Sequence, residues 1–142
     1  MGYHIRQRGS DFRIKKDNFA AALAAIKALA NKPEQMGGGN STGERWYSWV
    51  DMNELAAAET LPLALSAWRW EVDCSDETGD VFNITFCGEK LGDDTILFET
   101  LAPFVEKGSY IDMEGEDGSL WRWAFDGGGV VELTGEVSYK TY

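Results

Sequence analysis

The sequence is poor in the residue types that nucleophilic catalysis and zinc binding use most. Its 142 residues include one histidine and two cysteines. A Ser-His or Cys-His nucleophile would have to be built around His4, the single base that titrates near neutral pH. A zinc site needs three or four closely spaced ligands, whereas Cys74 and Cys87 stand far apart in the chain. We therefore expect no enzyme activity, no cofactor and no metal ion.

Long apolar runs are also missing. No stretch approaches the about 18 apolar residues of a membrane span, and residues 1–10 lack the apolar core of a secretory signal. We expect an intracellular, cytoplasmic protein without membrane association. In that compartment Cys74 and Cys87 are expected to be reduced thiols, because a domain of this size needs no disulfide to fold.

Positive charge is scarce and unevenly spread. The chain carries 13 Lys and Arg against 24 Asp and Glu, a net charge of −11. Residues 1–50 hold eight basic and four acidic residues, whereas residues 51–142 hold five and twenty. Direct nucleic-acid binding needs clustered Lys and Arg, so this balance argues against it and favours a basic protein partner. The alternative is that the acidic charge serves only solubility.

Aromatic residues, in contrast, are abundant, with six Trp, five Tyr and seven Phe. The apolar fraction of 44% is that of an ordinary globular protein, and the length suits one domain. We predict a single α+β domain over residues 1–142. Its many large rings either fill a core or form a binding surface.

The first third of the chain shows three patterns. Alternating residues on both sides of Gly9-Ser10-Asp11 predict a hairpin over 3–15. An apolar stripe predicts a helix over 17–30, with Asp17 as its N-cap. Residues 34–44 are rich in glycine without apolar periodicity, which predicts a flexible loop. That loop lacks the Gly-Lys-Ser/Thr ending of a phosphate-binding loop.

The remainder predicts further helices and strands. Two short helices are expected over 51–67, followed by strands at 68–73 and 82–86. A capped helix is expected over 93–105, and an antiparallel meander over 109–139. The fold class is therefore α+β, with a mostly antiparallel sheet of about six or seven strands and two or three helices packed on one face.

The hairpin over 109–126 carries the main functional hypothesis. A two-residue loop at its tip would sort its side chains onto two faces, whereas a loop of odd length would break that partition. One face would hold Ile111, Met113, Leu120, Arg122 and Ala124. The other would combine rings with carboxylates, and we predict that it binds a partner. With the hairpin tip, the predicted partner-binding residues are Tyr110, Asp112, Glu114, Glu116, Trp121, Trp123 and Phe125.

Two functions follow from these patterns. The first is a small acidic protein of bacterial or phage type, monomeric or homodimeric, that binds a macromolecular partner and acts as an inhibitor or acidic mimic. The alternative is a small-ligand or nucleotide-binding protein or enzyme, with a cleft lined by rings such as Trp68 and Trp70. Against both stands the possibility that the rings are the core, with Arg122 facing solvent.

Overall fold

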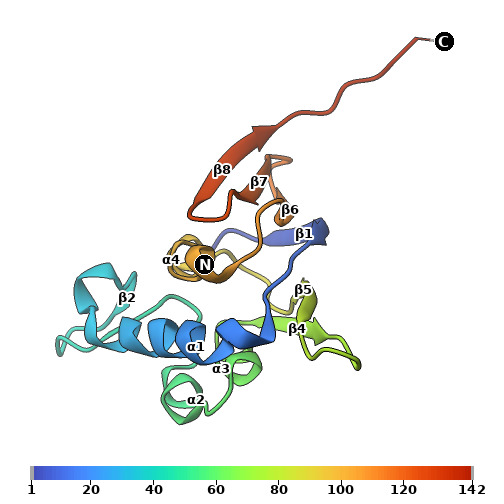
Figure 1. Ribbon diagram of the computed structural model, residues 1–142. Coiled ribbons are helices and arrows are strands. Elements are labelled where there is room, and N and C mark those ends of the chain that lie inside the picture. Colours follow the sequence, from blue (N-terminus) through green and yellow to red (C-terminus); the bar gives the residue numbers. More distant parts are fainter. Residues whose placement is uncertain (1, 142) are drawn as a thin grey trace.

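The computed structural model describes residues 2–141, and over that range the chain is a mixed α/β structure with antiparallel strand pairing (Figure 1). The α-helices are α1 (Phe19–Ala28), α2 (Met52–Ala57), α3 (Leu61–Ala67) and α4 (Asp94–Leu101). Short 3-10 turns occupy Lys16–Asn18, Leu29–Asn31, Pro33–Gln35 and Ala102–Phe104. The strands are β1 (Ile5–Asp11), β2 (Gly38–Gly39), β3 (Arg45–Trp46), β4 (Trp70–Cys74), β5 (Val81–Phe86), β6 (Tyr110–Gly115), β7 (Leu120–Phe125) and β8 (Val130–Gly135).

The largest sheet has four strands in the order β1-β6-β7-β8, all antiparallel to their neighbours. The predicted meander is confirmed as β6, β7 and β8. The predicted opening hairpin is wrong, because residues 5–11 form one continuous strand that pairs with β6. Its turn-like residues are accommodated by a register shift between Gln7 and Gly9. Residue Ile14, expected in the second hairpin strand, instead bridges Val81 and Val105.

The other strands form two small sheets, β4-β5 and β2-β3. The β4-β5 hairpin confirms the strands predicted at 68–73 and 82–86. Within the predicted glycine-rich loop, Met36 is buried and β2 pairs with β3, which begins directly after the loop. Its mobility stays a prediction. The mixed class with antiparallel pairing is confirmed, whereas the single sheet of six or seven strands is not, because the eight strands in residues 2–141 divide among three sheets.

Local capping explains where several helices start. Asp51 accepts a hydrogen bond from the backbone N–H of Glu54 and so caps α2. Thr60 caps α3 in the same way, with a proline in the first turn that fits its fixed φ. The predicted helix at 17–30 is confirmed as α1 with flanking 3-10 turns, but the cap assigned to Asp17 is wrong, since that residue lies inside the first turn.

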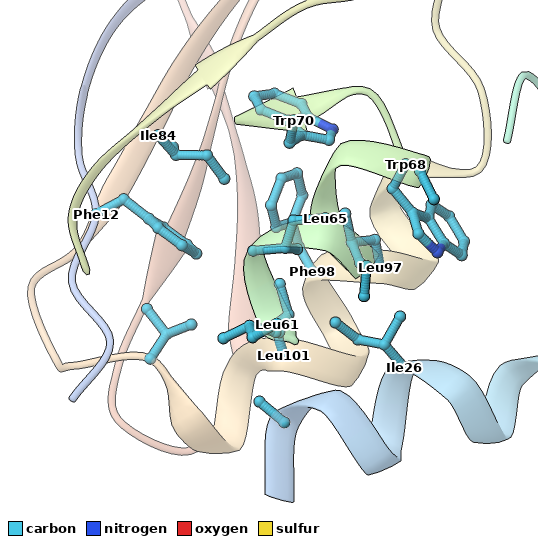
Figure 2. Close-up of a cluster of buried hydrophobic side chains, with 14 of the residues drawn as sticks. Phe12, Ile26, Leu61, Leu65, Trp68, Trp70, Ile84, Leu97, Phe98 and Leu101 are labelled. Carbon is cyan, nitrogen blue, oxygen red and sulfur yellow. The ribbon is translucent and has the colours of Figure 1, made fainter. Parts of the chain in front are cut away.

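Helix α4 packs on the inner face of the four-stranded sheet, and α1 packs against α4 (Figure 1). The ring of Phe98 lies 4.9 Å from that of Trp123 and 5.0 Å from that of Trp70, centroid to centroid. Figure 2 shows the apolar side chains of α1, α3 and α4 converging beneath Trp70. Trp68 and Trp70 are both fully buried. They therefore belong to the core rather than to a cleft.

A buried carboxylate links these layers. Asp94, at the start of α4, has no exposed side-chain surface. It accepts hydrogen bonds from the indole N–H of Trp70 at 2.9 Å and from the guanidinium of Arg69 at 3.0 Å. The neighbouring Asp93 accepts from the backbone N–H groups of Gly37 and Ser48. These two carboxylates thus join the loops before β2, before α2 and before β4.

Candidate functional site

Gly115 and Ser119 form the last pair of the β6-β7 hairpin, so its loop has three residues, Glu116-Asp117-Gly118. The N–H of Gly115 donates to the carbonyl of Ser119 at 2.8 Å, and the N–H of Gly118 donates back to the carbonyl of Gly115. Gly118 has a φ of +85°, the left-handed conformation that such a loop places at its last residue. This odd length sets Ile111 opposite Trp123 and Asp112 opposite Arg122.

The predicted partition of the hairpin is therefore wrong, because residues directly opposite each other share a face. The inner face carries Ile111, Met113, Trp121, Trp123 and Phe125, and the outer face carries Tyr110, Asp112, Glu114, Leu120, Arg122 and Ala124. Trp123 and Phe125 are 0% and 3% exposed, so they are core residues, and Trp121 is half-buried. The competing interpretation, rings inside and Arg122 in solvent, holds for Trp123, Phe125 and Arg122 but not for Tyr110, which lies on the outer face.

The outer side of this sheet is left uncovered by helices in residues 2–141, since α4 lies against the inner side (Figure 1). We call it the bare sheet face. Its side chains come from all four strands and are half-buried or exposed: Arg6, Arg8 and Asp11 of β1, Tyr110, Asp112 and Glu114 of β6, Leu120, Arg122 and Ala124 of β7, and Val131 and Leu133 of β8.

Two arginines hold the carboxylate of Glu114. Arg6 Nη2 lies 2.7 Å and Arg8 Nη1 2.8 Å from its Oε1. Hydrogen bonds from Arg6, and then from Arg8, hold the pKa of Glu114 below its usual range. Glu114 is therefore ionised at neutral pH, and its charge is balanced within the molecule.

The second carboxylate of the bare sheet face is also paired. Arg122 donates from Nε and Nη2 to the two oxygens of Asp112, at 2.5 and 2.9 Å. Its guanidinium carbon lies 4.1 Å from the centroid of the Tyr110 ring, a cation–π contact. The hydrogen bond to Asp112 raises the pKa of Arg122. These three side chains form a fixed ladder across β6 and β7.

The predicted site residue Glu116 lies apart from this ladder, in the loop at the end of the hairpin. Its Oε1 accepts from the backbone N–H of His4 at 2.8 Å, and its own N–H donates to the His4 carbonyl. The next residue, Asp117, accepts from the hydroxyl of Tyr3. The loop is thus tied to the segment before β1, and His4 Nδ1 comes within 3.7 Å of the Glu116 carboxylate.

A shallow hollow of about 330 Å³ opens on the bare sheet face over β6, β7 and β8. Trp121 borders the hollow, but its side chain belongs to the inner face, so this hollow offers no aromatic sandwich. Its floor mixes apolar and charged groups, among them Leu120, Leu133, Asp112 and Arg122.

Sequence reasoning missed five residues of this face: Arg6, Arg8, Asp11, Val131 and Leu133. Val131 and Leu133 could have been found, because the alternation of residues 130–139 already predicted a strand in which these two side chains share a face. The three residues of β1 carried no comparable signal, since nothing local indicates that β1 pairs with β6.

The part of the chain from residue 2 to 141 contains no group of three His, Cys, Asp or Glu close enough to hold a metal ion. Over the same residues, no helix has the length and apolar character needed to cross a bilayer. Cys74 and Cys87 are exposed and not bonded to each other. Comparison of the chain with protein-family models, curated proteins and solved structures gives no match in any of the three.

Proposed function

We propose that this protein binds a protein partner of net positive charge through the bare sheet face. The observation that carries the proposal is the Tyr110-Arg122-Asp112 ladder, exposed beside half-exposed apolar side chains on a sheet side that no helix of residues 2–141 covers. Arginine and tyrosine are the side chains most enriched, with tryptophan, among residues that dominate protein interfaces. Their geometry is fixed in advance here, which lowers the entropy lost on binding.

The charge of the whole chain supports a basic partner. A net charge of −11 attracts a cationic protein at long range and raises the rate of encounter. Contact itself would rely on other forces, because Asp112 and Glu114 are both neutralised by arginines. Acidic mimicry through those two carboxylates therefore loses its support, while attraction by the overall field does not.

The test compares two exposed arginines. Arg122→Ala removes the ladder, whereas the control Arg45→Ala changes the β2-β3 hairpin, where the arginine donates hydrogen bonds to the backbone carbonyls of Gly38 and Met36. Purified protein is immobilised, proteins of a lysate of the source cells are passed over it, and retained proteins are identified. Arg122→Ala should weaken retention of one basic protein by about 30-fold, the loss expected of a dominant interface residue. Arg45→Ala should retain it fully.

Equal retention by both variants would overturn the proposal, as would a retained protein that is acidic. Salt gives a further readout, because attraction between opposite net charges weakens as the Debye length shortens. Retention that is unchanged from low to high salt would contradict the role of the overall charge.

A small ligand is the second candidate, favoured by the hollow of about 330 Å³, a volume at the low end for ligand pockets. Titration with nucleotides tests it through tryptophan fluorescence, since Trp121 borders the hollow from the inner face. A saturable change that Leu133→Asp, in the wall of the hollow, abolishes would support this candidate.

A further inference from the structure

Exposed apolar side chains gather along β8 and the segment that follows it. Val131, Leu133, Val137 and Tyr139 are 48%, 47%, 60% and 94% exposed. They occupy every second position apart from Gly135, which is the period of a strand. Exposed apolar residues scattered singly are ordinary, but a regular row of four indicates a contact surface.

This row of apolar residues extends beyond the last residue of β8 that pairs with β7. β8 ends at Gly135, because its partner strand β7 begins directly opposite, at Leu120. Residues 136–141 continue the strand-like alternation and are exposed, and Figure 1 shows them running on from β8 away from the body of the protein. This segment therefore has the pattern of a strand without a strand beside it.

The outer edge of β8 is also free over the described residues, since the sheet order ends there. The N–H of Asp126 donates to the carbonyl of Gly129 across the β7-β8 turn. Because bonded and non-bonded pairs alternate along an antiparallel ladder, the backbone groups of Val130, Glu132 and Thr134 point outward. The β7-β8 register is continuous, without the bulge that commonly protects an edge strand.

We propose that residues 130–140 pair antiparallel with the same residues of a second copy, around a two-fold axis at Gly135. In this register Leu133 faces Val137 of the second copy, and Val131 faces its Tyr139. Each of these apolar pairs occurs twice by symmetry. On the other side of the strands, Thr134 faces Glu136 and Glu132 faces Ser138.

The charges select this register over its neighbours. Centring the axis on Thr134 would set Glu132 opposite Glu136, and centring it on Glu136 would set that carboxylate against its own copy. Like charges directly opposite each other destabilise a strand pair. The Gly135 register avoids both, and it places no side chain at the axis. This complementarity of the segment with itself is the argument for a second copy as the occupant.

The consequence goes beyond the proposed function. The pairing would join two four-stranded sheets into one of eight strands, with about twelve new backbone hydrogen bonds from six bonded residue pairs. Because all strand neighbours share the same outer side, the bare sheet faces of both copies would form one continuous surface.

A cysteine placed at the axis tests the register. Cys74 and Cys87 are exposed, so both are first replaced by serine. Residues of a non-hydrogen-bonded antiparallel pair lie about 4.5 Å apart at Cα, within disulfide range. Gly135→Cys should therefore form a covalent dimer on mild oxidation. Its added Cβ meets Cβ of Leu120 at 3.1 Å, so the backbone of β7 must move by a few tenths of an ångström to accommodate it.

Val137→Cys is the matched control, because the two copies of residue 137 would lie about 13 Å apart along the strands. It should not cross-link, whereas Leu133→Cys combined with Val137→Cys should. Cross-linking of Val137→Cys as efficient as that of Gly135→Cys would overturn the register.

Mass by light scattering on purified protein tests the dimer itself, independently of any other partner. The intact chain should give twice the mass of one chain, and a chain ending at Gly135 should give a monomer. An intact chain that stays monomeric at its highest soluble concentration overturns the proposal. So does a truncated chain that remains dimeric. The outcome of the Arg122→Ala retention experiment does not affect either of these mass measurements, so the two proposals are tested separately.

Discussion

Two arginine–aspartate pairs of this protein, one buried and one exposed, provide a controlled measurement of what burial adds to an ion pair. Arg69 and Asp94 have side chains that are 16% and 0% exposed, whereas those of Arg122 and Asp112 are 44% and 30% exposed. We predict that Asp94→Ala destabilises the protein far more than Asp112→Ala does.

The expected magnitudes follow from what each substitution leaves behind. Asp94→Ala leaves a largely buried guanidinium without a counter-charge and the indole N–H of Trp70 without an acceptor. Breaking a buried pair in this way costs about 3–5 kcal/mol. Asp112→Ala leaves Arg122 in contact with water, and exposed pairs contribute about 0–1 kcal/mol.

The assay is urea unfolding followed by tryptophan fluorescence. With a dependence on urea of about 2 kcal/mol per molar, Asp94→Ala should lower the midpoint by about 2 M, and Asp112→Ala by at most about 0.5 M. If Asp94→Ala does not fold, Asp94→Asn serves instead. The amide oxygen of the asparagine can still accept from Trp70, so the decrease in urea midpoint should lie between those of Asp94→Ala and Asp112→Ala.

Equal shifts for the substitutions at Asp94 and Asp112 would refute the reasoning. They would mean that the buried carboxylate does not hold α4 to β4. A double-mutant cycle with Arg69→Ala separates the pair from its surroundings, because only a true pair gives a coupling energy.

Three further predictions concern the sheet. Trp123→Ala should lower the free energy of unfolding by about 3–5 kcal/mol in the same urea assay, because it empties a fully buried site. Gly118→Ala should destabilise by about 1 kcal/mol, since its φ of +85° strains an L-residue, whereas Gly9→Ala, with open space around its Cβ, should be neutral or stabilising by up to about 1 kcal/mol. Backbone N–H groups of the β7-β8 turn lower the pKa of Asp126 in the folded state. That stabilisation should be complete above the unfolded pKa of about 4 and lost as pH falls through the lower folded value, and Asp126→Asn should flatten this part of a plot of Tm against pH.

The positions of most elements were predictable from the sequence, because they depend on local patterns. The alternation in β4, β5, β6 and β7 and the apolar stripe of α1 each point to the element that forms. The faces of the β6-β7 hairpin were not predictable from alternation alone. They depend on whether the loop has two residues or three, and Glu116-Asp117-Gly118 suits both lengths.

Pairing between distant strands was the second obstacle. The turn-like sequence Gly9-Ser10-Asp11 predicts a local hairpin, yet β1 finds its partner in β6, and the arginines of β1 thereby reach Glu114. No residue pattern within either strand indicates that β1 and β6 pair with each other. The ion pairs between Glu114 and the two arginines of β1 could therefore not be predicted from the sequence.

The pairing of β1 with β6 also affects how the chain is made. Ile5 lies opposite Gly115, so roughly 100 residues must leave the ribosome before the earliest strand meets its neighbour, and contacts of such long sequence separation slow folding. Until then both backbone edges of β1 are unpaired, and unpaired strand edges make a partly folded chain prone to aggregation. During translation, Arg6 and Arg8 place like charges on the waiting strand, which discourages it from joining another nascent chain.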